Sequence, residues 1–204
     1  MDPPRPAPLA LLLALVLGFT VTAQAWDKLE QCQHTICPRF TRKAQHETYE
    51  ERVYEPTKWI CTEIQRPILP LVMGAQKTLK EFSERKSQEI GIDIVEDTWP
   101  GLLYQDSGRG MGYGMCWLVR PEVPLPDSDS DKLPVKVKTF PQTTMFVRLF
   151  SGPPSLEEGQ ENAEKLKEDL RKAGETFNDN IFYGAGYEGF LSLTHHSEIW
   201  IPKA

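Results

Sequence analysis

Hydrophobic positions in two stretches of the chain recur with the period of a helix. Between Pro67 and Gly91 the apolar side chains fall on one helical face, and prolines stand at the start, where a first turn tolerates them. Between Ser155 and Gly174 the same spacing follows a capping box made by Ser155 and Glu158. The pattern predicts two amphipathic helices, each ended by a glycine. Their apolar positions are Val72, Ala75, Leu79 and Phe82 in the first stretch and Ala163, Leu166, Leu170 and Ala173 in the second.

Most other apolar runs are short and bounded by glycine or proline, which is typical of strands. The run from Tyr49 to Ile64 predicts two strands around a turn at Glu55-Pro56-Thr57, and Ile92 to Val95 is predicted to open a further set of strands. The glycine-spaced segment from Gly108 to Gly114 lacks the spacing of a nucleotide-binding loop and predicts a hairpin or a bulged strand. More strands are expected at 115–119, 135–138 and 143–150.

The last strand pair frames a candidate ligand-binding loop. Ile181 to Tyr183 and Glu198 to Ile201 are β-forming runs that predict two paired strands. A loop presented by rigid strands is a common place for ligand contacts. Each half of the chain therefore has a strand pair, a helix and more strands, which predicts two helices covering a sheet or barrel. The loop carries Phe190, Leu191, Leu193, His195 and His196.

The start of the chain has the features of a secretory leader. An apolar run of about a dozen residues precedes an Ala-x-Ala cleavage site that ends at Ala25. The run is shorter than the roughly 20 residues that span a bilayer, and an uncleaved anchor is the alternative. We expect a signal peptide at 1–25, an N-terminal extension at 26–48 and one domain at 49–204. The mature protein is then expected to be secreted or to lie in the secretory-pathway lumen, with no stable membrane insertion.

Charge and cysteine content narrow the partners and the compartment. The net charge of −6 without a basic stripe argues against nucleic acids and anionic membrane surfaces as binding partners.

Four cysteines in an oxidising compartment predict two disulfides. We expect Cys32 to pair with Cys37, which is close in sequence, and Cys61 to pair with Cys116, since both lie in apolar strand-like runs. The alternative is a metal held by Cys32, His34 and Cys37, for which only three ligands are in view.

The sequence contains no recognisable catalytic motif. There is no Gly-x-Ser-x-Gly elbow and no His-Glu-x-x-His pair, so we expect a protein that is not an enzyme. The final loop and the first helix are instead expected to form a shallow pocket for a flat apolar ligand with an acidic edge. His195 or His196 is then a candidate axial ligand for heme iron, the only metal expected. In the alternative, both histidines are ordinary loop residues of a hairpin.

Short motifs between residues 49 and 202 occur in a characteristic order and spacing. They are Tyr49-Glu50, Tyr54-x-Pro56-x-Lys58-Trp59, Thr98-x-Pro100, Met145-Phe146-Val147-Arg148 with Ser151-Gly152, and Tyr183-x-Ala185-Gly186-Tyr187 with Glu198-Ile199-Trp200. Through these motifs the chain resembles the SOUL/heme-binding protein family. The resemblance implies an α+β fold, a distorted antiparallel β-barrel flanked by two helices and built from two pseudo-symmetric halves. It also implies similarity to the effector-binding domains of bacterial multidrug-responsive regulators.

The resemblance further implies non-enzymatic binding of heme or another tetrapyrrole, as a ligand rather than a catalytic cofactor. By position it implicates Met73, Lys77 and Lys80 of the first helix, together with the final loop. The chain departs from the family in its leader, its added cysteines and its His195-His196 pair, which replaces a basic pair. These departures motivate a second hypothesis, a secreted scaffold of the same fold that binds an extracellular protein partner through its N-terminal extension.

Overall fold

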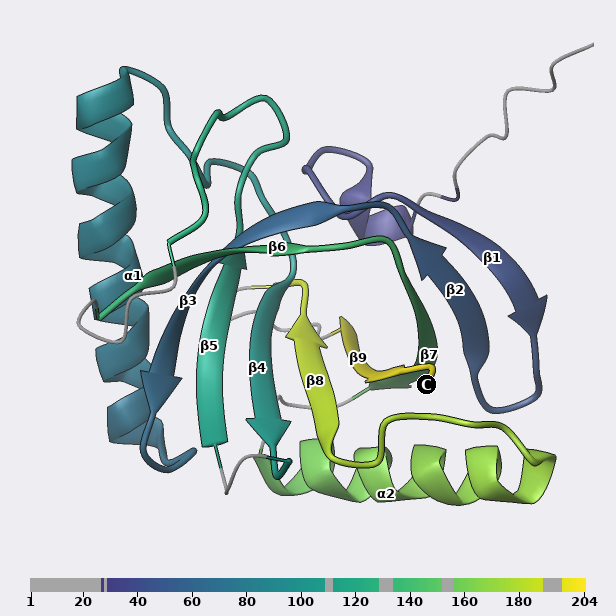
Figure 1. Cartoon of the computed structure of the whole chain (residues 1–204). Helices are drawn as coiled ribbons and strands as arrows, with labels where there is room; N and C mark the ends of the chain where they lie inside the picture. The colour runs from purple at the N-terminus through teal and green to yellow at the C-terminus, as the bar shows by residue number, and fades with distance from the viewer. Residues whose placement is uncertain (1–26, 28, 109–111, 129–133, 152–155, 189–195) are drawn as a thin grey trace, which may run out of the picture.

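The computed structural model describes residues 27, 29–108, 112–128, 134–151, 156–188 and 196–204, in which one curled antiparallel sheet is flanked by two α-helices (Figure 1). The helices are α1 (Leu69–Ile90) and α2 (Leu156–Ala173), and a short 3-10 helix, η1 (Glu30–Cys32), precedes the sheet. The strands are β1 (Phe40–Gln45), β2 (Glu50–Tyr54), β3 (Thr57–Ile64), β4 (Gly101–Asp106), β5 (Gly112–Leu118), β6 (Lys136–Phe140), β7 (Thr143–Ser151), β8 (Ile181–Gly186) and β9 (His196–Pro202).

The sheet curls because four of its strands form one continuous bent ribbon. β2 pairs with β7 and β3 pairs with β6, and the register is unchanged across the bend, where Tyr54 faces Thr143 and Thr57 faces Phe140. Short connections that contain a proline join β2 to β3 and β6 to β7. In the order β1-β2-β7-β9-β8-β4-β5-β3-β6, this ribbon connects the two ends of the sheet. The predicted distorted barrel with two helices is confirmed.

Both faces of the curled sheet carry apolar cores. Residues alternate in β3, so Trp59 and Cys61 join the inner core while Ile60 and Ile64 join the outer core under α1. The inner core draws residues from β1 to β5 and from β7 to β9, as expected for the inside of a barrel. On the outer face, α1 packs on β3 and β5, and α2 packs on β7 and β9. The two helices therefore cover different parts of one face and leave the strands between them less covered.

The described part of the N-terminal extension packs against the inside of the sheet. Cys32 is buried in the inner core, and Leu29, Ile36 and Cys37 pack against it. The Ile36 amide donates to the Asp97 carbonyl, and the Ile36 carbonyl accepts from the Trp99 amide. The range predicted as an extension also contains β1, which pairs with β2 at the edge of the sheet. These residues lie on the barrel and do not project from it.

The structure has both expected disulfides. Cys32 is joined to Cys37, which excludes the alternative in which their thiolates hold a metal. Cys61 is joined to Cys116, and these residues face each other directly on β3 and β5. Among the described residues no cysteine is free, and no cluster of three or more histidine, cysteine or carboxylate side chains could hold a metal ion.

The two predicted helices are confirmed. Ser155, the first residue of the predicted capping box, lies outside the described residues. Gly91 and Gly174 follow the helices with φ angles of 80° and 72°, the left-handed conformation that glycine adopts most easily. Val72, Ala75 and Leu79 are buried under α1, and Ala163, Leu166 and Leu170 are buried under α2, whereas Phe82 is half-buried and Ala173 is exposed. Within the described residues no helix is long and apolar enough to cross a bilayer.

The strand predicted at Ile92 to Val95 is wrong. This segment forms turns, because the Asp93 carboxylate accepts hydrogen bonds from the Val95 and Glu96 amides at 2.9 Å each. Such local side-chain bonds compete with a strand ladder for the backbone donors. Ile94 is nevertheless fully buried, so the apolar signal came from a turn that packs against the core under α1.

Candidate functional site

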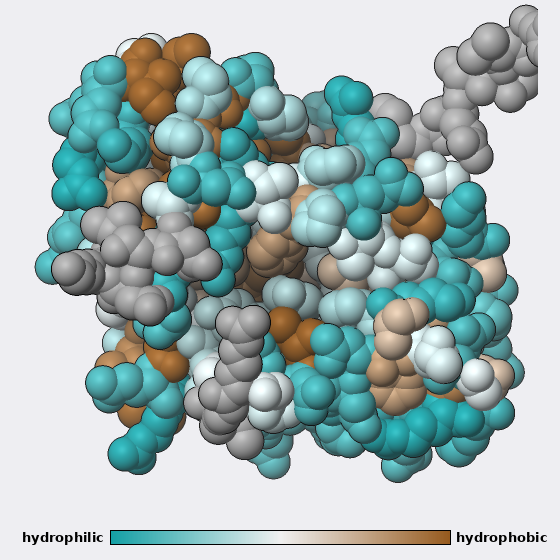
Figure 2. Space-filling view, in the orientation of Figure 1, coloured by the Kyte–Doolittle hydropathy of each residue, from teal (hydrophilic) through white to brown (hydrophobic). Residues whose placement is uncertain are grey.

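A cleft of about 380 Å³ lies between the two helices on the outer face of β5, β4 and β8. Its floor consists of cross-strand rows, in which one residue from each of the three strands lies beside its partner on the next strand. The face of the molecule shown in Figure 2 is mostly hydrophilic, with an apolar patch over the upper end of α1. Across β5, β4 and β8 the rows of the floor are Trp117–Gly101–Gly186, Met115–Leu103–Gly184 and Tyr113–Gln105–Phe182.

Glycines in the central strands make room for the cleft. Gly101, Gly184 and Gly186 have no side chain, so the sheet is bare at these positions between the helices. A Cβ atom at Gly184 would meet the Leu103 carbonyl oxygen at an ordinary 3.7 Å, and one at Gly186 would meet nothing within 4 Å. A glycine inside a strand often marks a place where a ligand approaches the backbone closely. The open space above these residues fits that role.

The helices supply the walls of the cleft. Val72 and Gln76 line it from α1, and Gly159 and Gln160 line it from α2. The Gln160 side-chain amide donates to the Gln105 side-chain oxygen at 3.2 Å, which ties α2 to the floor. The segment from Thr98 to Pro100 lines one end of the cleft. Apolar walls with a few polar groups are the usual make-up of a small-molecule site.

The helix residues predicted from the sequence lie beside the cleft and do not line it. Met73 is 59% exposed, and the side chains of Lys77 and Lys80 reach solvent, where they pair with Glu81 and Glu84. Their neighbours Val72 and Gln76 are the residues that face the cleft. The final hairpin is confirmed, because β8 and β9 pair. Of its predicted ligand-contacting residues, Phe190, Leu191, Leu193 and His195 lie outside the described residues.

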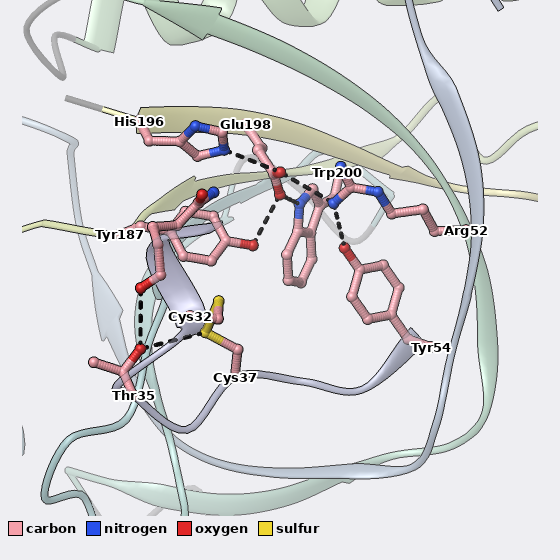
Figure 3. Close-up of a disulfide and its surroundings, with 10 residues drawn as sticks. Cys32, Thr35, Cys37, Arg52, Tyr54, Tyr187, His196, Glu198 and Trp200 are labelled. Atoms are coloured by element: carbon pink, nitrogen blue, oxygen red, sulfur yellow. Dashed lines mark hydrogen bonds and ion pairs between the residues drawn. A yellow bond between two sulfur atoms is a disulfide. The ribbon is translucent and has the colours of Figure 1, made fainter. Parts of the chain in front are cut away.

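His196 lies at the start of β9 and contacts a buried charged network inside the barrel (Figure 3). Its Nε2 atom is 3.3 Å from Glu198 Oε1, and its ring meets the edge of Tyr187. It is not among the described residues that line the cleft. At the other end of the network Arg52 donates to Glu198 Oε1 at 3.0 Å and to Glu50 at 2.6 Å.

The network holds a fully buried carboxylate in its charged form. Burial alone would raise the pKa of the Glu198 carboxyl, but the hydrogen bond to His196 and the charge of Arg52 hold it below its ordinary value. Tyr187 and the Trp200 indole also donate to Glu198, at 2.9 and 2.7 Å. Burial raises the pKa of Tyr187 well above its ordinary value, so this phenol stays protonated as a donor. Both oxygens of Glu198 therefore have partners, whereas Arg52 Nη2 is buried without a hydrogen-bond partner among the described residues. No cluster of described side chains beside this ion pair could hold a metal.

Comparison with known proteins settles the family. The model of the SOUL heme-binding protein family matches residues 35–202, which is most of the chain. The chain belongs to the SOUL heme-binding protein family. Heme-binding protein 2 of Mus musculus is 29% identical over 165 residues, covering 76% of this chain and 77% of that protein. Heme-binding protein 2 of Homo sapiens is 26% identical over 161 residues, with the same coverage.

Solved structures agree on the fold of this SOUL protein. The C-terminal domain of EcmrR superposes with a TM-score of 0.54 at 13% identity, over 76% of this chain and 98% of that domain. A Listeria innocua protein described as a hydrolase superposes with a TM-score of 0.53 at 12% identity, over 79% of this chain and 94% of that one. At these identities the likeness concerns the architecture alone.

The lining of the cleft was only partly visible in the sequence. Val72 was predicted on the apolar face of its helix, but the strand glycines were interpreted as punctuation between strands. In the structure Gly184 and Gly186 belong to β8 and lie on the floor of the cleft. Glycines at alternate positions of a strand are the signal that would have pointed to this floor.

Proposed function

We propose that this SOUL protein is a non-enzymatic binder of heme or another tetrapyrrole, and that the ring enters the cleft between α1 and α2. The observation that carries the proposal is the apolar, aromatic-lined cleft of about 380 Å³ in a member of a heme-binding family. Leu103, Met115, Trp117 and Phe182 present flat or flexible apolar groups, and the floor glycines let a planar ring approach the backbone. Binding of this kind needs no catalytic side chain.

The lining residues suit apolar contacts with the ring of a tetrapyrrole better than coordination of its iron. Among the described lining residues there is no histidine or cysteine. Groups of the lining whose chemistry suits iron include the Met115 sulfur and the Tyr113 hydroxyl. His195, the other candidate from the sequence, lies outside the described residues. Burial of the ring between aromatic side chains therefore supplies the main attraction, and the proposal does not depend on one axial ligand.

We also propose that the mature chain acts in the secretory pathway or outside the cell. The leader-like first 25 residues and the two disulfides support this location. Mass spectrometry of the protein secreted by transfected cells tests this location. A mature N-terminus at Trp26 is expected, and a protein that remains in the cytosol with its first residues intact would contradict the proposal.

The cleft is tested by a hemin titration with two matched glycine variants. Gly159→Leu places a side chain in the cleft from α2, whereas Gly74→Leu places the same side chain on the exposed surface of α1. Neither glycine has a neighbour within 4 Å of an added Cβ atom, and leucine is the better helix former by up to about 1 kcal/mol. Both variants should therefore fold.

Tryptophan quenching by hemin should saturate near one ligand per chain in the wild type and in Gly74→Leu. In Gly159→Leu the affinity should fall roughly tenfold or more, because the side chain occupies the space of the ring. Equal affinity in the two variants would overturn the cleft as the site. A linear response without saturation in the wild type would overturn tetrapyrrole binding.

A further inference from the structure

The cleft carries no positive side chain among its described lining residues. Its charged lining residues are Glu188 and Glu198, and no lysine, arginine or histidine is among them. The final loop, residues 189–195, also contains no lysine or arginine in its sequence. A tetrapyrrole held by its carboxylates needs cations at the site, because carboxylates are bound most strongly by guanidinium or ammonium groups.

Two cations that lie close in sequence to lining residues, Lys77 of α1 and Arg148 of β7, are directed away from the cleft. Lys77 follows the lining residue Gln76, yet its side chain is 77% exposed and lies 3.7 Å from Glu81 on the same helix. On β7, two residues before the lining residue Phe150, Arg148 donates to Asp169 and Asn162. The positive charges of Lys77 and Arg148 are therefore directed to partners outside the cleft.

The two carboxylates in the lining differ in how their charge is balanced. Glu198 is fully buried and shares its charge with Arg52 inside the barrel. Glu188 follows the end of β8, and its Oε2 atom accepts a hydrogen bond from the His196 amide at 2.7 Å. An amide neutralises no charge, so Glu188 contributes negative potential at this end of the cleft. The aromatic faces of the lining favour a cation further, since their electron density attracts positive charge.

We propose that the cleft selects the ring of a flat aromatic ligand in a neutral or cationic form, and that tetrapyrrole carboxylates stay in solvent outside it. This inference rests on the proposed function and adds the orientation and charge class of the ligand. The ring enters over the floor glycines, and the acidic edge points away from Glu188. Loss of the ligand's negative charge then strengthens binding, the opposite of a site built on propionate ion pairs.

The test compares three forms of one ring: deuteroporphyrin IX, its dimethyl ester and its bis(2-aminoethyl)amide, which carries two ammonium groups. Affinity is measured by tryptophan quenching at low and high salt. The ester should bind at least as tightly as the diacid. The diammonium form should bind roughly 3- to 10-fold more tightly than the diacid at low salt, with a smaller difference at high salt.

Two variants locate the origin of the preference. Glu188→Gln keeps an oxygen that accepts from the His196 amide but removes the charge, so it should reduce the preference for the diammonium form severalfold. Glu84→Gln removes an exposed carboxylate on α1 that pairs with Lys80 and does not line the cleft, and it should change nothing. A diacid that binds roughly tenfold more tightly than its ester would overturn the inference and leave the proposed function standing. Absence of saturable binding by all three rings would overturn both.

Discussion

Glu198 and Arg52 form a buried ion pair inside the barrel. Both side chains are fully buried, and they come from β9 and β2, which lie on opposite sides of β7. A buried ion pair adds little net stability when intact, but removing one partner leaves a charge without compensation in a medium that solvates it poorly. The motif Glu198-Ile199-Trp200 correctly predicted a strand, β9. The ion pair between Glu198 and Arg52 could not be predicted, because it depends on the order of strands in the sheet, which no local sequence pattern shows.

Glu198→Gln is expected to lower the free energy of unfolding by about 3 kcal/mol, because Arg52 then retains only Glu50 as a charged partner. The measurement is urea unfolding followed by tryptophan fluorescence. Glu84→Gln, at an exposed position of α1, serves as the control and should stay within about 0.5 kcal/mol of the wild type. Equal stability of the two variants would show that the buried network contributes nothing to the fold.

The same pair gives a pH dependence of known sign. The pKa of Glu198 is lower in the folded protein than its ordinary value, so its stabilising contribution is complete above the ordinary carboxyl pKa and is lost as the pH falls through the folded one. The difference in unfolding free energy between wild type and Glu198→Gln should therefore be constant near pH 7 and shrink below about pH 4. A difference that grows on acidification would contradict the ionised state of Glu198.

At the scale of elements, periodicity identified both helices but not which of their positions line the cleft. The apolar spacing of α1 predicted the buried positions Val72, Ala75 and Leu79, and glycine predicted the end of the helix. The ligand-contacting residues assigned by resemblance, Met73 and Lys77, lie one position away from the cleft-lining Val72 and Gln76. Whether a helix position faces a neighbouring element depends on packing, which spacing alone does not determine.

Leu79→Ala and Met73→Ala test this division of α1. Leu79 is fully buried against the sheet, so its truncation should cost about 3 kcal/mol of unfolding free energy through lost burial and the cavity it leaves. Met73 is 59% exposed, and its truncation should cost less than about 0.5 kcal/mol and leave hemin affinity unchanged. A large loss of affinity in Met73→Ala with normal stability would move the ligand to the outer side of the helix.

At the scale of the whole molecule, the sequence indicated most of the strands, but neither β1 nor the ribbon that closes the barrel. Both short connections of the ribbon resemble hairpin turns in sequence, and proline signals mark each of them. In the structure the strands on either side of each connection do not pair with each other, because the chain continues in the same direction round the barrel. The partners in this ribbon are far apart in sequence, as Tyr54 and Thr143 are, and such distant pairs leave no local signal.

The two disulfides should stabilise the molecule unequally. Cys61 and Cys116 close a loop with a sequence separation of 55, whereas the separation of Cys32 and Cys37 is 5. Restriction of the unfolded chain by loop closure predicts a loss of about 4 kcal/mol for Cys61→Ala with Cys116→Ala, and about 2 kcal/mol for Cys32→Ala with Cys37→Ala. Urea unfolding of the two double variants measures this order, and the reverse order would show that packing at the inner core outweighs loop length.

The most direct test of the central claim is to locate hemin on the protein by paramagnetic NMR. Amide signals are compared with iron protoporphyrin and with its zinc counterpart, which has the same ring without the paramagnetic iron. The account predicts that broadening is strongest at Leu103, Met115 and Gly184 on the cleft floor, and absent at Thr41 and Arg42 on the edge strand β1. Broadening centred on β1 and β2, or spread evenly over the surface without saturation, would contradict a tetrapyrrole site between α1 and α2.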